Sequence, residues 1–223
     1  MLAPVPTSYD YRPPTEPFLT VVHVDDDILV LDKPSGLLSV PGKDPSLADC
    51  LAVRAAERYP GARIVHRLDK DTSGIMVLGL SRRAISGLGI QFERRQVRKS
   101  YVARVWGQLE GDSGRVDLPL AVDWDNKPRQ RVDLEQGRPA QTDWLVLDRE
   151  AGATRVKLTP RTGRTHQLRV HMLAIGHPIL GDPFYATGEA LAAADRLQLH
   201  AEVLAFAHPA DGRACDFIVP APF

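Results

Sequence analysis

The residues from 66 to 74, HRLDKDTSG, place two carboxylates and several basic side chains between two apolar runs. A carboxylate held in a cleft can act as a nucleophile or as a general acid or base. The spacing of Asp69 and Asp71 also permits the paired acids of a nuclease or glycosidase. The same composition is typical of an ordinary solvated turn, because Asp, Thr, Ser and Gly all favour turns. Residue types alone therefore leave these alternatives open.

A second polar segment, RTGRTHQLRVHM, covers residues 161–172 and continues into GHPILGD. His166, His171 and His177 could be considered as metal ligands. Their spacings of five and six residues suit one helical face poorly, and no HExxH pattern or cysteine partner accompanies them. We therefore expect no metal site here. A basic surface helix with an apolar face is the other reading of this segment.

Four motifs follow one another along residues 18–223: LDKPSGLLSVPG, HRLDxxTSG, RKSYVARVWG, and RTGRTHQLRVHM with GHPILGD. Their order and wording resemble the RluA-type pseudouridine synthases, which isomerise uridine in RNA. The resemblance implies an α+β pseudouridine synthase fold, with a mixed, mainly antiparallel sheet and a central catalytic cleft. It implies no redox cofactor and no metal.

The resemblance also implies roles for individual residues of this chain. Asp69 is then the nucleophile, and Arg169 is the cation that keeps it ionised. Arg67 fills the space that the flipped uridine leaves, Tyr101 offers a ring and a hydroxyl to the detached uracil, and Leu168 forms an apolar wall beneath the base. Whether Asp69 attacks the ribose, attacks the ring or removes a ribose proton is left open by the sequence.

Positive charge gathers between residues 91 and 104, where five basic side chains stand against one glutamate. RNA backbones are bound by such local clusters rather than by overall charge. We expect Arg94, Arg95 and Arg98 to contact phosphates. A solvated helix end is the ordinary alternative.

The overall composition is that of a water-soluble globular protein: 223 residues, 43% of them hydrophobic, with Lys+Arg and Asp+Glu both equal to 28. The two cysteines, Cys50 and Cys215, form no CxxC pair, so a zinc ribbon is not expected. The first residues lack the charged start and apolar core of a signal peptide. No apolar run approaches the roughly 20 residues that span a bilayer. These features favour a cytoplasmic protein, and we expect a monomer.

Secondary structure can be read coarsely from the pattern. Residues 1–17 contain five prolines and are expected to form an extended arm, and residues 18–223 are expected to form one catalytic domain. Residues 18–33 predict a hairpin, and residues 46–58 and 81–95 predict helices that begin at Ser46 and Ser81. Residues 166–176 predict a further helix that Gly176 closes. Strands outnumber helices and come as hairpins, which favours α+β.

The arm is too short to be an accessory RNA-binding domain, so we expect a small RNA footprint. The resemblance is to the single-domain, dual-specificity branch of the family, which implies two RNA substrates: a tRNA anticodon stem-loop and a hairpin of 23S rRNA. An enzyme with one rRNA or tRNA substrate is an alternative. A non-catalytic RNA-binding or RNA-folding module is another, although the nucleophile motif is intact.

Overall fold

A computed structural model describes residues 11–223, which divide into two compact units. Among the described residues, the unit that contains Asp69 comprises 11–99 together with His200–Pro222, and we call it the Asp69 unit. The unit that contains Arg169 comprises Ser100–Leu199, and we call it the Arg169 unit. The expectation of one catalytic domain over residues 18–223 stays a prediction. Residues 1–10 of the expected arm lie outside the described residues.

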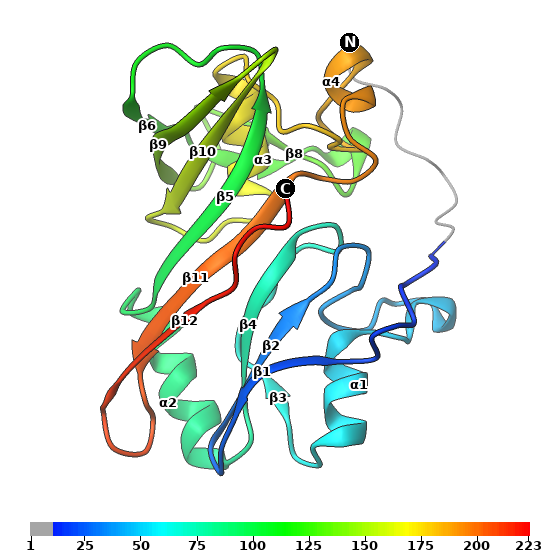
Figure 1. The fold of residues 1–223 in the computed structure, drawn as a ribbon, viewed down its shortest axis with the longest axis vertical. Helices are drawn as coiled ribbons and strands as arrows, with labels where there is room; N and C mark the ends of the chain where they lie inside the picture. Colours follow the sequence, from blue (N-terminus) through cyan, green and yellow to red (C-terminus); the bar gives the residue numbers. More distant parts are fainter. Residues whose placement is uncertain (1–10) are drawn as a thin grey trace. The chain divides into compact units, whose positions relative to one another are not determined.

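The Asp69 unit is a sheet with helices packed on it (Figure 1). The strand order is β1-β2-β4-β11, with β3 on β4 and β12 on β11. All these pairs are antiparallel except β4 with β11, which is parallel. The elements are β1 (Thr20–Val24), β2 (Ile28–Lys33), η1 (Pro45–Leu47), α1 (Leu51–Arg58), β3 (Arg63–Ile64), β4 (Ser73–Gly79), α2 (Arg82–Glu93), β11 (Leu199–Ala207) and β12 (Ala214–Ile218).

The core of this unit forms because apolar side chains of α2 face those of the central strands. Ala84 and Leu88 of α2 pack with Ile28, Val77 and Leu204, all of them buried. The predicted hairpin of β1 and β2 is confirmed. Helix α2 begins as predicted, since the Ser81 side chain accepts a hydrogen bond from the Ala84 amide.

The predicted start of the first helix at Ser46 is wrong. Residues 45–47 form only a 3-10 turn, in which the Asp44 carboxylate accepts hydrogen bonds from the Ser46 amide and hydroxyl. The chain is then extended at Cys50, and α1 begins at Leu51. Asp49, expected inside the helix, instead pairs with Arg54 at 2.6 Å.

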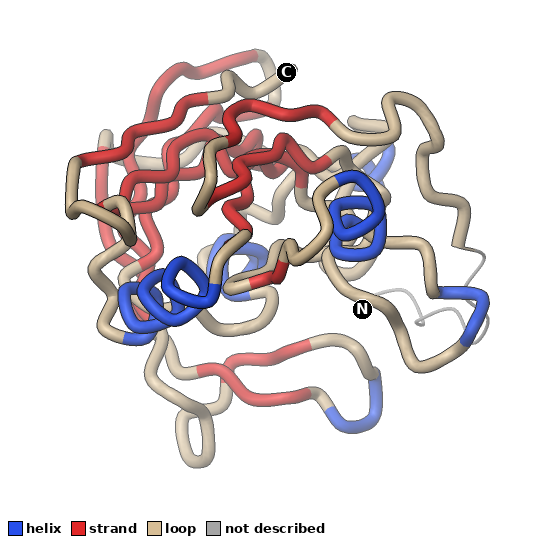
Figure 2. Tube along the Cα trace, turned by 90° about the horizontal axis from the view of Figure 1, so that it is seen from below, coloured by secondary structure: helices blue, strands red, loops and turns tan. Residues whose placement is uncertain are grey.

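Within the Arg169 unit, the strands pair antiparallel in the order β5-β10-β9-β6, with most of β5 in this unit. A second sheet is the hairpin β7-β8, which Figure 2 shows as a separate pair of red strands joined by a short blue turn. The elements are β5 (Arg98–Trp106), β6 (Ser113–Asp117), β7 (Leu120–Val122), η2 (Trp124–Asn126), β8 (Gln130–Val132), β9 (Gln141–Glu150), β10 (Ala153–Pro160), α3 (Gln167–Ala174) and α4 (Gly188–Ala192).

Helix α3 is buried along most of its length, including the polar side chains of Gln167, Arg169 and His171, so the alternative of a basic surface helix is wrong. Leu168 and Met172 pack against Val156 and Leu158 of β10, while Val170 belongs to a cluster with Tyr185. The helix was predicted with its end at Gly176, and this residue does adopt a positive φ of 86°. The strands and helices together confirm the α+β class with a mainly antiparallel sheet.

Candidate active site

Asp69 lies in the loop between β3 and β4, half-buried, one residue beyond buried Leu68. The Thr72 amide donates to the Asp69 carbonyl at 3.2 Å and closes a turn around it. Gly74, the second residue of β4, has a φ of 112°, and a Cβ there would lie 2.2 Å from the Ala201 carbonyl oxygen. Only glycine therefore fits, which explains the Thr-Ser-Gly ending of the motif.

The preceding KPSG loop, residues 33–36, makes hydrogen bonds to the backbone of the loop that carries Asp69. The ammonium of Lys33 donates to the carbonyl oxygens of Pro34, Leu37 and Lys70 at 2.8, 2.7 and 2.9 Å. The Gly36 amide donates to the same Lys70 carbonyl at 2.9 Å. Two of the sequence motifs therefore form one structure, in which a buried lysine joins the first loop to the backbone beside Asp69.

Serine hydroxyls add a second set of contacts between the two loops. Ser35 donates to the Asp71 carbonyl at 2.7 Å. Ser39 donates to the Leu68 carbonyl at 2.7 Å and accepts from the Leu68 amide at 3.1 Å. The backbone on both sides of Asp69 is thus held by side chains about 30 residues away in sequence or more. These bonds fix the position of the Asp69 Cα, from which the carboxylate projects.

The first residue of the motif, His66, has a structural role. Its Nε2 accepts a hydrogen bond from the Val77 amide at 3.0 Å, and its ring stacks on Phe92 with centroids 4.3 Å apart. Burial, together with the charge of Lys99, lowers the pKa of His66 to about 3. The imidazole is therefore neutral at physiological pH. Arg67, the next residue, is exposed.

Arg169 is 1% exposed and forms a two-point ion pair with Asp182. Its Nε donates to Oδ2 at 2.8 Å, and its Nη2 donates to Oδ1 at 2.6 Å. The guanidinium carbon lies 5.1 Å from the ring centroids of both Phe184 and Tyr185. Asp182 also accepts hydrogen bonds from the amides of these two residues. The position of Arg169 in its unit is therefore fixed by a charge and two rings.

The RTGRTH segment before α3 is folded around the side chain of Gln167. The Gln167 Oε1 accepts from the Thr162 hydroxyl at 2.7 Å and from the Arg164 amide at 3.0 Å. Its Nε2 donates to the Gln141 carbonyl and the Thr142 hydroxyl. These bonds set the start of α3, and with it the direction in which Leu168 and Arg169 leave the helix.

Tyr101 and Leu168 are brought together by the core of the Arg169 unit. Tyr101 lies on β5, opposite Leu158 of β10, and is half-buried. Leu168 is 7% exposed and belongs to the buried cluster against which Tyr101 packs. The structure thus places these two predicted residues with Arg169 in one unit and Asp69 with Arg67 in the other. The pairing of Arg169 with Asp69 stays a prediction.

The three arginines expected to contact phosphates are exposed at the end of α2 and the start of β5. Arg98 forms an ion pair with Asp216. Two neighbours that the sequence grouped with them behave differently. Lys99 is half-buried over the Phe92 ring, and burial lowers its pKa. Arg104 lies in the other unit, where it pairs with Glu150. The exposed charge is smaller than the sequence count suggested.

The three histidines considered as metal ligands each contact other groups. His166 bonds the Tyr185 hydroxyl, His171 bonds Thr142 and the Leu118 carbonyl, and His177 bonds the Trp106 carbonyl. Within residues 11–223, no group of three or more His, Cys, Asp or Glu side chains has the arrangement of a metal site. Over the same stretch, no helix has the length and apolar character needed to cross a membrane.

Sequence reasoning missed Asp182 and gave Lys33 no role. Asp182 stands in the GHPILGD string, where an acid between an apolar run and PFY is a signal for a buried partner. Lys33 ends an apolar strand directly before Pro-Ser-Gly, and a lysine at the end of a buried strand is a similar signal. Neither signal names the group that the side chain contacts.

Comparisons with known proteins agree over nearly the whole chain. The chain is 54% identical over 215 residues to the dual-specificity RNA pseudouridine synthase RluA of Salmonella typhi, covering 96% of this chain and 98% of that protein. It is 52% identical to the protein of the same description from Pasteurella multocida, again over 96% and 98%.

Solved structures give the same result for the fold. The human RNA pseudouridylate synthase domain containing 1 superimposes with a TM-score of 0.77 at 31% identity, covering 92% of this chain and 84% of that chain. The human protein RNA pseudouridylate synthase domain containing 4 superimposes with a TM-score of 0.72 at 26% identity, covering 91% of this chain and 88% of that chain. The sequence model described as RNA pseudouridylate synthase matches residues 27–174, which include both Asp69 and Arg169. The chain belongs to the RNA pseudouridylate synthase family.

Proposed function

We propose that this chain converts specific uridines of structured RNA to pseudouridine, with Asp69 as the nucleophile. The observation that carries the proposal is the 54% identity over 96% of the chain to an RNA pseudouridine synthase. That identity extends across both units and so includes the loop of Asp69 and the helix of Arg169. The fixed backbone around Asp69 supports the choice of this carboxylate.

The reaction breaks the N1–C1′ bond of uridine, turns the detached uracil and forms a C5–C1′ bond, after which the proton on C5 leaves. No atom other than this proton is exchanged, so the reaction needs neither an oxidant nor a reductant. A carboxylate nucleophile suffices. Attack on C1′, attack on the ring and removal of a ribose proton all require Asp69 to be ionised when the substrate arrives.

The remaining residues of the proposed site prepare the base and the carboxylate. Arg169 is the proposed counter-ion of Asp69, since a guanidinium stays charged and can bond carboxylate oxygens. Arg67 takes the place of the flipped base, which lowers the cost of extruding it. Tyr101 and Leu168 hold the uracil, with the tyrosine hydroxyl near C5, from which the proton must finally leave.

Asp69→Asn tests the proposal because it keeps the shape of the side chain and removes its charge. We expect pseudouridine formation to fall below detection, with folding and RNA affinity retained. The assay is release of tritium from RNA labelled at C5 of uracil. Asp71→Asn is the matched control, since the Asp71 carboxylate lies in the same loop and pairs with Lys70.

Three outcomes would overturn this assignment. Activity of Asp69→Asn within tenfold of the wild type would show that Asp69 is not the nucleophile. Release of free uracil that needs both carboxylates would indicate a glycosidase. Binding of RNA by the wild type without any pseudouridine would indicate an RNA-binding or RNA-folding module.

The substrates that we propose are a tRNA anticodon stem-loop and a hairpin of 23S rRNA. The relatives at 52–54% identity are described as dual-specificity enzymes, which favours two RNAs over one. An enzyme that modifies a single rRNA or tRNA is the alternative. We also propose that the protein acts as a monomer in the cytoplasm, where both RNAs are found.

A further inference from the structure

The tip of the β7-β8 hairpin carries a tryptophan that points into solvent. Trp124 is 68% exposed, although tryptophan is among the side chains most often packed against other residues. It lies at the start of η2, in the connection between the two strands. A ligand that covers this ring would gain free energy in proportion to the apolar area it removes from water.

The backbone that carries Trp124 is ordered by its own hydrogen bonds. The Asp123 amide donates to the Arg129 carbonyl at 3.0 Å, and the Arg129 amide donates to the Asn126 carbonyl at 3.0 Å. The Asn126 side chain also donates to the Asp123 carboxylate at 3.0 Å. The ammonium of Lys127 lies 4.0 Å from the Trp124 ring centroid, over one face. Lys127 therefore packs on one face of the ring, and the 68% exposure of Trp124 leaves ring surface open to a ligand.

The hairpin is connected to Arg169 through a short path inside one unit. The Gln130 amide donates to the Tyr185 hydroxyl at 2.8 Å, and this hydroxyl also bonds His166 Nδ1 at 2.7 Å. The Arg169 guanidinium lies over the Tyr185 ring. Trp124 therefore lies on a hairpin that is hydrogen-bonded to Tyr185, and Tyr185 packs against Arg169 of the proposed site.

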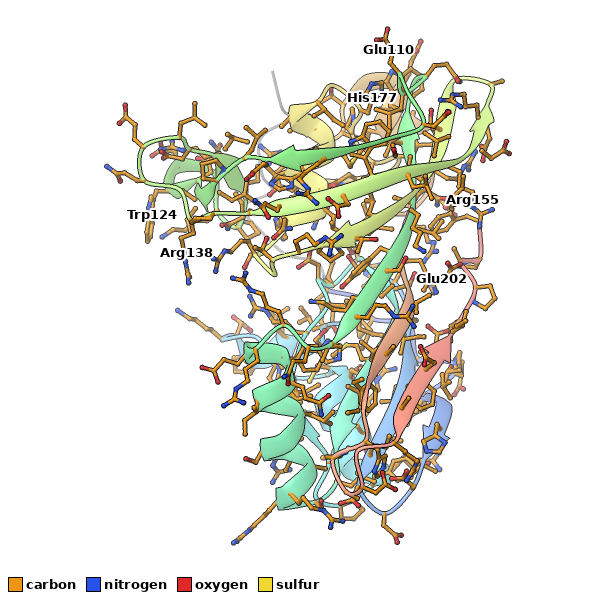
Figure 3. All side chains as sticks on the ribbon, turned by 90° about the vertical axis from the view of Figure 1, so that its left-hand side faces the viewer. Glu110, Trp124, Arg138, Arg155, His177 and Glu202 are labelled. Atoms are coloured by element: carbon orange, nitrogen blue, oxygen red, sulfur yellow. The ribbon has the colours of Figure 1, made fainter. Side chains whose placement is uncertain are left out.

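The surroundings of Trp124 indicate the kind of partner. Its exposed neighbours in sequence are Asp125, Asn126 and Lys127, which are polar or charged. Arg138, whose backbone pairs with Leu120 of β7, is exposed as well, and Figure 3 shows both Trp124 and Arg138 projecting outward. A protein partner needs a contiguous apolar patch, whereas a nucleic-acid base needs one ring and nearby cations.

We propose that the open face of Trp124 stacks on one unpaired base in the loop of the RNA substrate, and that Lys127 and Arg138 contact the phosphates beside it. The proposal rests on the proposed function and adds a second contact point to it. Asp123 and Asp125 offset the nearby positive charge. Stacking rather than charge therefore supplies most of the affinity, and Trp124 selects RNAs that offer it an unpaired base.

The test uses Trp124→Ala, Trp124→Phe and Lys127→Met in the full-length chain, with Leu134→Ala as the control. Leu134 is 77% exposed and lies just after β8, so it matches the exposure but has no aromatic ring. The RNAs are the anticodon stem-loop and the rRNA hairpin, each also prepared with an abasic residue at one loop position at a time. Dissociation constants are measured in an Asp69→Asn background, and KM and kcat with Asp69 intact.

For Trp124→Ala we expect the Kd and KM to rise by about 5- to 100-fold, the range found when stacking aromatics are replaced by alanine. The kcat and the salt dependence of binding should be unchanged. Trp124→Phe should stay close to the wild type, and Lys127→Met should lower the salt slope by less than one unit. At one loop position, an abasic residue should weaken the wild type but leave Trp124→Ala unaffected.

Two results would overturn the proposal. Binding by Trp124→Ala within twofold of the wild type on both hairpins is one. A loss that is equal for every abasic RNA is the other, because it would indicate a structural effect. Crosslinking of the wild type to 5-iodouridine at the coupled loop position should label the peptide with Trp124, and this readout does not depend on the folding of any variant. A failure of the proposed function can be told apart from a failure of this proposal, because RNA binding in the Asp69→Asn background is measured without turnover.

Discussion

Lys33 is fully buried, and its ammonium donates to three backbone carbonyls of the two loops around Asp69. An ammonium has three donors, and a neutral amine has two, so only the charged form can satisfy all three carbonyls. Burial lowers the pKa of Lys33 to about 7, while the carboxylates of Asp71 and Asp69 oppose the shift. The residue is therefore both a positioning group for Asp69 and a source of pH dependence.

We expect Lys33→Met to lower the free energy of unfolding by ~2–4 kcal/mol at pH 7, because it leaves buried carbonyls without a donor. Activity should fall by at least about tenfold, because a displacement of the nucleophile of about 1 Å is costly. The pKa of Lys33 lies below the lysine value of 10.5, so the unfolded chain binds more protons between pH 7 and 10.5. The contribution of Lys33 to stability therefore rises with pH across that window and is constant below it.

Urea unfolding of the wild type and Lys33→Met at pH 6, 7.5 and 9 measures this contribution. The difference in unfolding free energy between the two proteins should grow from pH 7.5 to pH 9. Lys43→Met is the matched control, since Lys43 is exposed in the same unit. Parallel pH curves for wild type and Lys33→Met would contradict the assignment of this pH dependence to Lys33.

Asp182 and Arg169 form a buried ion pair, and such pairs are most sensitive to the loss of one partner. Asp182→Asn should lower the free energy of unfolding by about 3–5 kcal/mol, since loss of one partner of a buried ion pair removes an opposite charge and two hydrogen bonds from Arg169. Adding Arg169→Met to this variant should restore part of the stability but none of the activity. A urea unfolding cycle over the wild type, both single variants and the double variant tests this. Additive losses would show that the two side chains are not coupled.

At this scale the sequence offers candidate side chains but not the groups that they contact. Asp69, Arg67 and Tyr101 stand in strings whose order is informative by itself. The ion pair between Arg169 and Asp182 cannot be predicted from the two motifs alone. It depends on the backbone at Gly181, which has a φ of 66°. Partners depend on tertiary structure, and a linear pattern does not encode them.

The turn between α2 and β5 is the element that presents the proposed phosphate contacts. Neutralising Arg94 or Arg95 to glutamine should lower the salt slope of RNA binding by up to about 0.9 units each, and equally for all RNAs. Arg98 already forms an ion pair with Asp216, so Arg98→Gln should change the slope less. The measurement is the dissociation constant for one hairpin at several salt concentrations.

Arg58→Gln is the control for these variants, because Arg58 is exposed on α1 of the same unit. An unchanged slope in Arg94→Gln, Arg95→Gln and Arg98→Gln would place the phosphate contacts elsewhere. A larger change for Arg98 than for Arg94 would mean that RNA displaces Asp216 from its partner.

Elements were predicted where local signals agree with packing, and missed where they compete. Ser81 precedes a run with one apolar face, and α2 begins there as predicted. Ser46 carries the same capping signal, but Asp44 captures its amide first and the chain leaves the helix again before Leu51. Two polar side chains within three residues make the start of a helix ambiguous from sequence.

On the scale of the whole molecule, the division into two units was not predictable from composition. The chain leaves the Asp69 unit at Lys99 and returns to it at His200, where β11 pairs with β4 near Gly74. The Ser73 hydroxyl contacts His200 Nδ1 at 2.9 Å at the point of return. Residues separated by more than a hundred positions thus pair in the strand that follows the Asp69 loop. No periodicity in the sequence indicates this pairing of β4 with β11.

On the same scale, we predict a small RNA footprint. Hairpin loops suit such an enzyme, because their bases are already partly unstacked and cost less to flip. We expect isolated stem-loops of roughly 15–20 nucleotides to be good substrates, one from a tRNA anticodon and one from 23S rRNA.

Incubation of each minimal hairpin with the enzyme, followed by carbodiimide-blocked primer extension, maps the modified uridine. A hairpin with the target uridine replaced by cytidine is the control, and it should give no stop. Modification of intact ribosomal subunits or full-length tRNA alone would contradict the small footprint, because it would require contacts beyond the loop and its closing pairs. Reaction of the rRNA hairpin with an inert anticodon hairpin would instead assign the enzyme a single substrate, since both loops offer an unstacked base and only sequence-specific contacts could then separate them.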